Sequence, residues 1–356
     1  MIGRSALAWP GAPLALASAA LFGASTPLAK LLLGEVDPWL LAGLLYLGSG
    51  IGLGIVHLGR RSLGIEPPEA PLRHTDLPWL AAVILAGGIV GPVLLMLGLS
   101  ITPASSAALL LNVEGLATMA IAWLVFHENA DRRIVLGALC ILAGAVLLSW
   151  QGGAGGIGWG ALAIVGACLA WGIDNNLTRK LSAADPVQIA MLKGLVAGAV
   201  NLGLALWHGA ALPAAGPLLG AGVVGFLGYG VSLVLFVLAL RHLGTARTGA
   251  YFSMAPFIGA VLALVLFSEP LTARLVAAAA LMGVGLYLHL VEHHEHEHRH
   301  EEMMHEHAHV HDEHHRHAHG PDDPAGEPHV HVHRHAPMIH RHPHYPDLHH
   351  RHTHPA

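Results

Sequence analysis

The chain has 356 residues, of which 54% are hydrophobic and only 12% are charged, and its formal net charge is −5. An ordinary soluble domain carries about 25% charged residues, so the composition argues against a water-soluble protein and points to lipid. The polar residues are unevenly distributed, because 24 of the 30 histidines follow His289. The sequence therefore divides into a long apolar part and a shorter His-rich tail.

Segments long enough to cross a membrane fill the apolar part. A transmembrane helix needs about 20 mostly apolar residues. Continuously apolar runs favour helices over the shorter, alternating strands of a membrane β-barrel. The connections are too short for a soluble domain. The predicted spans are residues 14–33, 39–58, 77–99, 104–126, 134–149, 159–177, 187–207, 217–240, 248–267 and 275–291.

Basic residues in the connections predict the orientation of these helices in the lipid bilayer. If the N-terminus is cytoplasmic, nearly all Lys and Arg between the spans fall on the cytoplasmic side, and only Lys30 and Arg274 fall on the other side. An even number of spans returns the tail to the starting side. We therefore predict a multi-pass protein of the plasma (inner) membrane with both termini cytoplasmic.

An internal repeat relates the two halves of the apolar part. A repeat of five helices must enter the membrane from opposite sides in its two copies. The basic residues agree, because they follow the second and fourth spans of one half but the first and third of the other. Matching residues are Phe22-Gly23 with Trp171-Gly172, Asp37-Pro38 with Asp185-Pro186, and, at an offset of 141, Phe126-His127-Glu128 with Phe267-Ser268-Glu269.

The predicted fold is thus an all-α integral membrane protein with ten transmembrane helices in two inverted five-helix repeats. The first repeat takes residues 1–150, the second takes residues 151–291, and residues 292–356 form the tail.

Short motifs recur in both halves. The second half has Gly228-Tyr229, Pro256 within residues 253–257, Ser268-Glu269-Pro270 and residues 283–285. The first half repeats this pattern more loosely, at Gly91-Pro92, residues 97–105 and His127-Glu128. In these motifs the sequence resembles the EamA-type members of the drug/metabolite transporter superfamily over residues 14–291.

The resemblance implies a ten-helix fold with cytoplasmic termini and alternating access to a central cavity between the halves. It says little about the substrate. One position departs from the common pattern, because Glu114-Gly115 stands where the second half has Ala255-Pro256.

Glu114 is the sharpest candidate for a functional residue. It lies about ten residues into its span, near the middle of the membrane at 1.5 Å per residue, with Asn112 two positions earlier. An ionisable side chain at that depth is costly and normally faces a cavity or a partner. It can couple transport to a proton or cation, or bind a basic substrate. Alternatively, it is a protonated residue bonded to a neighbouring helix.

Further polar residues interrupt the sixth and seventh spans. Asp174, Asn175 and Asn176 either line a cavity or cap the end of their helix. Lys193 lies about two turns inside its span, from where it can extend to the membrane surface or pair with Asp174 or Glu114.

Aromatic residues and prolines complete the candidate site. Trp171, Tyr229 and Tyr251 can stack on a substrate or pack between helices. Pro92 and Pro256 remove backbone hydrogen bonds, which in transporters often marks kinked helices around a binding site.

Glycines 48, 50, 52 and 54 in the second span predict close helix packing. Their small-xxx-small spacing suits contacts within one monomer or between two monomers of a homodimer.

Alternating His residues fill the tail, which is of low complexity and is predicted to be disordered. Neutral imidazole binds Ni, Co and Zn, so these ions are expected ligands of the tail, although no cofactor is required. The candidate metal ligands are His305, His307, His309, His311, His329, His331, His333 and His335.

Three functions fit the sequence. The first is export of a small-molecule metabolite or organic compound, with a metal-binding tail. The second is export of Ni, Co or Zn, with the tail collecting the cargo. The third is a membrane-tethered metal buffer or sensor. No nucleotide-binding loop or catalytic triad is recognisable, so a secondary transporter and no enzyme is expected, and no basic patch suits nucleic acid.

Overall fold

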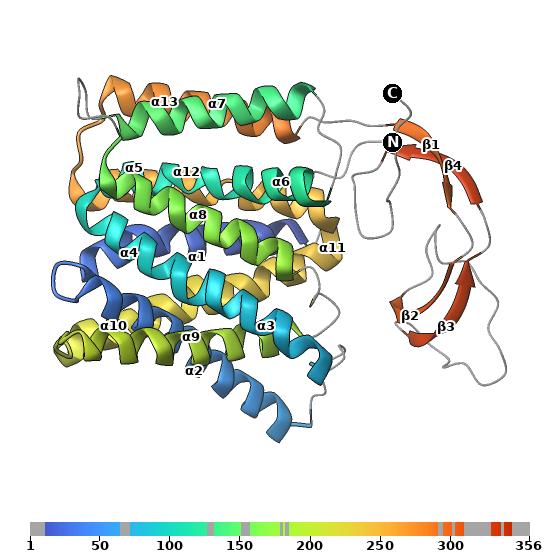
Figure 1. Ribbon diagram of the computed structural model, residues 1–356, viewed down its shortest axis with the longest axis horizontal. Coiled ribbons are helices and arrows are strands. Elements are labelled where there is room, and N and C mark those ends of the chain that lie inside the picture. Colours follow the sequence, from blue (N-terminus) through green and yellow to red (C-terminus); the bar gives the residue numbers. More distant parts are fainter. Residues whose placement is uncertain are drawn as a thin grey trace. The chain divides into compact units, whose positions relative to one another are not determined.

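The structure is a computed structural model of the chain (Figure 1). It divides into two units, residues 1–291 and residues 292–356, which are described separately. The described residues are 11–64, 72–126, 132–150, 157–178, 181, 185–290, 295–300, 303–309, 329–335 and 338–343.

The regular elements of the first unit, among its described residues, are helices. Its first half contains α1 (Gly11–Leu32), α2 (Pro38–Ser62), the short helix η2 (His74–Asp76), α3 (Leu77–Val83), the π-helical segment η3 (Ile84–Val90), α4 (Gly91–Ile101), α5 (Ala104–Leu110), α6 (Asn112–Phe126) and α7 (Arg132–Ser149). Its second half contains α8 (Trp159–Thr178), α9 (Pro186–Trp207), α10 (Ala215–Gly225), the π-helical segment η6 (Phe226–Val231), α11 (Ser232–Phe252), α12 (Ala255–Phe267) and α13 (Ala273–Leu290).

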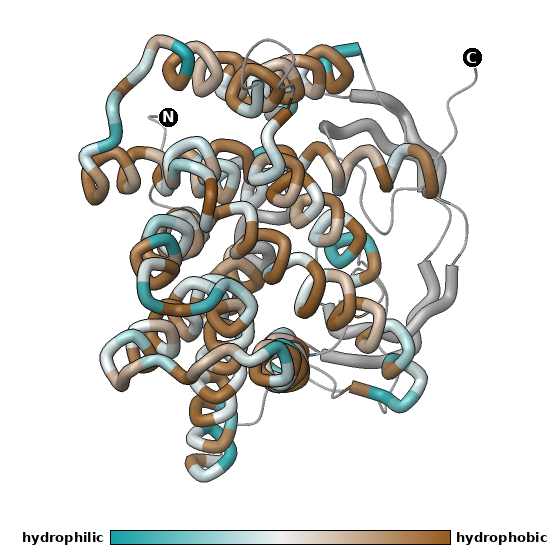
Figure 2. The backbone as a smooth tube through the Cα atoms, turned by 60° about the vertical axis from the view of Figure 1, so that its left-hand side comes forward, coloured by the Kyte–Doolittle hydropathy of each residue, from teal (hydrophilic) through white to brown (hydrophobic). Residues whose placement is uncertain are grey.

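Eight stretches of helix among the described residues are long and apolar enough to cross a membrane. Each coincides with one of the first eight predicted spans. The last two predicted spans correspond to shorter apolar helices, Ala255–Phe267 and Ala273–His289. Hydrophobic residues predominate along the helices, whereas hydrophilic residues gather mainly near helix ends and connections (Figure 2).

One predicted span begins in the wrong place. Residues 248–252 continue α11, and α12 starts only at Ala255, with Pro256 in its first turn. Proline is tolerated there because the first N–H groups of a helix have no partner within it. Pro256 therefore begins a helix and does not kink one, contrary to the prediction.

Aspartates begin corresponding helices in the two halves. Asp37 accepts hydrogen bonds from Trp39 N and Leu40 N at the start of α2, at 2.9 and 3.1 Å. Asp185 accepts one from Val187 N at the start of α9, at 2.9 Å. In each case proline follows, which suits the first helical position.

Helices of one half pack mainly on helices of the other. Helix α2 lies along α9, and α7 lies along α13. Helix α1 packs against α11 and α12, while α8 packs against α4 and α6, and α5 meets α12. The apolar core of the unit therefore lies largely between the two halves.

Glycines allow the closest of these contacts. A Cβ on Gly50 would lie 2.4 Å from Leu195 N, and one on Gly194 would lie 2.6 Å from Gly50 N. Gly48 and Gly52 approach Gly222 and Phe226 in the same way. These three glycines of the predicted series thus pack within one chain.

Four short strands are described in the tail, where the sequence predicts disorder. Strand β1 (Glu295–His300) pairs with β4 (Met338–Pro343), and β2 (Met303–His309) pairs with β3 (His329–His335), both antiparallel. Alternation of His with another residue has the period of two that suits a strand, and disorder of the tail as a whole stays a prediction. His311 lies outside the described residues.

Substitution of Gly50 by Ala tests the packing of α2 on α9. The new methyl group meets the α9 backbone, so we expect a loss of about 1–3 kcal/mol in stability. Gly54→Ala is the matched control, because its Cβ would meet only Met191 Sδ, at 3.8 Å. Thermal unfolding of both variants in detergent gives the comparison, and equal unfolding temperatures would contradict it.

Candidate functional site

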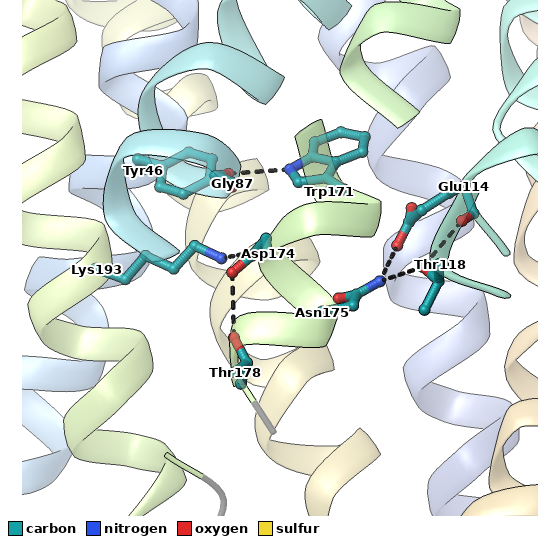
Figure 3. Close-up of polar contacts among 9 residues, drawn as sticks. All are labelled: Tyr46, Gly87, Glu114, Thr118, Trp171, Asp174, Asn175, Thr178 and Lys193. Carbon is teal, nitrogen blue, oxygen red and sulfur yellow. Dashed lines mark hydrogen bonds and ion pairs between the residues drawn. The ribbon is translucent and has the colours of Figure 1, made fainter. Parts of the chain in front are cut away.

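Two consecutive residues of α8, Asp174 and Asn175, point to opposite sides of that helix (Figure 3). Asp174 forms an ion pair with Lys193 of α9 and accepts a hydrogen bond from Thr178 Oγ1 at 3.1 Å. The Asp174 and Lys193 side chains are 7% and 15% exposed. Removing two charges from water this far is costly unless they are paired, which explains why Lys193 turns inward toward Asp174.

On the other side of α8, Asn175 reaches α6. Its Nδ2 donates to Glu114 Oε1 and to Thr118 Oγ1, both at 3.1 Å. Thr118 Oγ1 donates in turn to Glu114 O at 2.9 Å. Glu114 is half-buried, whereas Asn175 is exposed. The neighbouring Asn176 is buried and donates to Thr118 O at 3.0 Å, so Asp174, Asn175 and Asn176 all make contacts between helices.

Helix η3 borders the ion pair because of Pro92. Proline has no N–H, so the carbonyls that it would otherwise serve, Gly88 in an α-helix or Gly87 in a π-helix, lack that partner. Side chains from other helices replace it. Gly87 O accepts from Tyr46 OH at 2.6 Å and Trp171 Nε1 at 3.0 Å.

Asn201 of α9 provides the remaining bond, because its Nδ2 donates to Gly88 O at 3.1 Å. Its side chain is fully buried. Helices α2, α8 and α9 thus each supply a donor to one turn of η3. Trp171 and Asn201 thus tie this turn of the first half to the second half.

Glycine at position 87 lets Asp174 approach η3. A Cβ there would lie 2.0 Å from Asp174 Oδ2, so any side chain at this position would displace the carboxylate. Gly91 likewise faces Trp171, with Nε1 2.8 Å from a hypothetical Cβ. The glycines therefore bring the carboxylate and the indole against the same backbone turn.

A second π-helical segment, η6, lies in the other half, with Gly228 at an offset of 141 from Gly87. It faces Ser25, whose Cβ would be 2.6 Å from a Cβ on Gly228. Ser25 and Asp174 each follow the matched aromatic residues, Phe22 and Trp171, by three positions. The two halves thus share a scaffold, but one carries a charged pair where the other carries a hydroxyl.

Aromatic rings connect these two regions. The ring centroid of Tyr229 lies 5.5 Å from that of Tyr46 and 6.0 Å from that of Phe22. Phe252 continues the series 5.3 Å from Phe22. Tyr229 therefore packs between rings of α1 and α2, beside the residues that hold η3.

Other predicted site residues lie apart from this network. Asn112 is buried and donates to Leu109 O at 2.9 Å and Met282 Sδ at 3.8 Å, which directs it toward α13. Tyr251 and Pro256 are half-buried near the junction of α11 and α12. Among the described residues, no group of three His, Cys, Asp or Glu side chains is placed to hold a metal ion.

Sequence reasoning missed Tyr46, Thr118 and Asn201. Tyr46 and Asn201 are polar groups within long apolar runs, and that was the only signal they carried. The carbonyls that they or their neighbours satisfy are predictable from Pro92 alone, but the donors are not, because they come from other helices.

Comparisons with known proteins agree with this architecture. The model of the EamA-like transporter family matches the chain twice, over residues 9–150 and 158–291. An uncharacterized transporter of Methanothermobacter thermautotrophicus is 28% identical over 282 residues, which cover 75% of this chain and 82% of that protein. A protein of known crystal structure is similar in fold, with a TM-score of 0.58 and 21% identity over 79% of this chain and 98% of that one.

The long apolar helices define a multi-pass membrane protein. The chain belongs to the EamA-like transporter family.

Exchange of Tyr46 for Phe tests the anchoring of η3. Loss of a bond to the Gly87 carbonyl is expected to cost about 1–2 kcal/mol of stability. In a Pro92→Ala background the restored N–H can serve η3, so the same exchange should cost less. Thermal unfolding in detergent of the wild type, Tyr46→Phe, Pro92→Ala and the double variant measures how far the two effects on stability depend on each other. Tyr287→Phe is the control, because Tyr287 is exposed. Equal costs in both backgrounds would contradict the role assigned to Pro92.

Proposed function

We propose that the protein is a secondary transporter that exports a small metabolite or organic compound by alternating access. Ten helices form two inverted repeats, residues 1–150 and 151–291. Both termini lie in the cytoplasm, and the membrane is the plasma (inner) membrane. The tail binds transition metals on the cytoplasmic side.

The reciprocal packing of the helices supports the inverted repeats. Matched helices pack on each other, as α2 does on α9 and α7 does on α13. The contacts of α1 with α11 and α12 are mirrored by those of α8 with α4 and α6. A twofold relation between two halves produces this pattern, in which each contact has a counterpart with the halves exchanged.

The hydrogen-bonded set of Glu114, Asn175 and Thr118 is the observation that carries the proposed site. An amide donor neutralises no charge, so Glu114 can exchange a proton or bind a basic group of the cargo. Asp174 is different, because Lys193 already neutralises it. Glu114 is therefore the residue proposed to couple transport.

Export in cells tests the role of Glu114. Glu114→Gln keeps the shape but removes the charge, so export should fall to the level of cells without the protein. Glu35→Gln is the matched control, because Glu35 is exposed in the connection between α1 and α2. Untargeted mass spectrometry of medium and cell extracts identifies compounds whose export needs the wild-type chain. Unchanged export by Glu114→Gln would refute the assignment.

Cross-strand register supports metal binding by the tail. Strands β2 and β3 place His305, His307 and His309 opposite His333, His331 and His329. Residues directly opposite in an antiparallel pair have Cβ atoms about 5 Å apart, near enough for two imidazoles to share one ion. His335 is opposite Met303 and is not part of these pairs.

Titration of the purified chain with Ni(II) tests the tail. The full chain should bind several ions at neutral pH, and binding should weaken as the histidines are protonated near pH 6. A chain ending after Val291 is the control and should lose this binding. Equal binding by both chains would contradict a role for the tail.

Export of the metal itself is the second candidate function, favoured by the His-rich tail alone. Vesicle flux assays with Ni or Zn distinguish export of a metal ion from export of an organic compound. If both removal of the tail and Glu114→Gln abolish metal flux, metal is the cargo. If neither changes it, export of an organic compound is retained.

A further inference from the structure

The connection between α4 and α5 is held by two side chains from distant parts of the sequence. The Lys30 ammonium, at the end of α1, donates to Leu99 O, to Ser100 O at 3.1 Å and to Thr102 O at 3.0 Å. The Glu269 carboxylate, just after α12, accepts from Ala104 N at 2.8 Å. It also accepts from Ser105 N at 3.2 Å and from Ser105 Oγ.

These bonds satisfy backbone groups that a helix end leaves without partners. The last carbonyls of α4 and the first N–H groups of α5 have none within their own helices. Helix ends are usually capped by a residue next to them in sequence. Here Pro103 precedes α5 and provides no side-chain cap. The caps come from 69 to 165 positions away, so they exist only while the parts that carry them stay together.

The two caps belong to a different packing group from the one that contains α4. Helix α1 packs on α11 and α12, and Glu269 follows α12 directly. Helix α4 packs on α8. Lys30 therefore joins the group of α1, α11 and α12 to α4, and Glu269 ties the adjoining start of α5 to the end of α12, at one end of the bundle. We call this the Lys30 end.

The backbone before Glu269 is shaped for this contact. Ser268 has φ 49° and ψ 38°, the left-handed conformation that residues other than glycine rarely adopt. It ends α12 and turns the chain just before Glu269. A strained residue at this point indicates that the position of the next side chain is held by the surrounding structure.

We propose that Lys30 and Glu269 form a lock that closes the Lys30 end of the transport path and must open in each cycle. This proposal rests on the alternating access proposed above. When the two groups of helices separate at this end, water enters and hydrates the freed carbonyl and N–H groups. The lock is therefore strong in the closed, dry state and weak in the open, wet state.

Arg274 provides a built-in comparison at the same end. It donates to Leu147 O, to Leu148 O at 3.2 Å and to Trp150 O, and so caps α7 in the same way. However, it joins only α13 to α7, which lie along each other. Loss of this cap should leave the Lys30 end closed.

Distance measurement by pulsed electron paramagnetic resonance tests the lock. Spin labels replace the exposed Ile101 and Leu271, on the two sides of the contact, in a full-length chain with Cys140 and Cys168 changed to Ala and placed in lipid nanodiscs. Lys30→Met or Glu269→Gln should raise the population with the longer distance, relative to the population with the shorter distance, about tenfold. Lys30→Arg, which keeps the donors, and Arg274→Gln should resemble the parent.

A charge exchange separates the lock from an ordinary ion pair. In the double variant Lys30→Glu with Glu269→Lys, each charge faces backbone groups that repel it, so the Lys30 end should remain open. A parent-like distance distribution in this variant would overturn the proposal, as would parent-like distributions in both single variants. No substrate is needed, so the result is independent of whether Glu114→Gln blocks export.

Discussion

Backbone hydrogen bonding within lipid is the constraint on which the rest of this structure depends. Water cannot satisfy a free carbonyl in the core of a bilayer, so every carbonyl that loses its helical partner needs another donor. Pro92 removes a donor in the middle of the third predicted span. Tyr46, Trp171 and Asn201 replace it from three other helices. The repair ties the first half of the chain to the second, and it brings Asp174 and Lys193 beside the repaired turn.

The two halves use one scaffold for different chemistry. Each has a π-helical segment at the corresponding position, faced by a helix of the other half that carries an aromatic residue and, three positions later, a polar one. Only in one half is that polar residue charged, and only there does a neighbouring helix contribute a lysine. Because α8 is shared by the ion pair and by the Glu114 contact, movement of α8 affects both sides of the proposed site at once.

Helix ends follow the same rule as the helix interior. At the Lys30 end, charged side chains provide the hydrogen-bond partners that the backbone lacks. The helix that carries each side chain decides which two helices it connects. Arg274 stays within one pair of helices, whereas Lys30 connects α1 to α4, two helices that the proposed opening of the Lys30 end separates. A helix cap taken from a distant element is therefore both a stabilising contact and a reporter of how the elements are arranged.

The sequence by itself determined the membrane environment, the family and the location of the eight long apolar helices, because these depend on local composition and on short repeated motifs. It also indicated Glu114, Asp174 and Lys193, since charges within apolar runs are visible without a structure. Which of these charges pair was decided only by the tertiary structure: Lys193 meets Asp174, and Glu114 meets Asn175. Asn112 points elsewhere, and Pro256 begins a helix. The partners of Gly87 and of the α4–α5 connection lie tens of residues or more away, and distances in space between such segments leave no trace in local sequence.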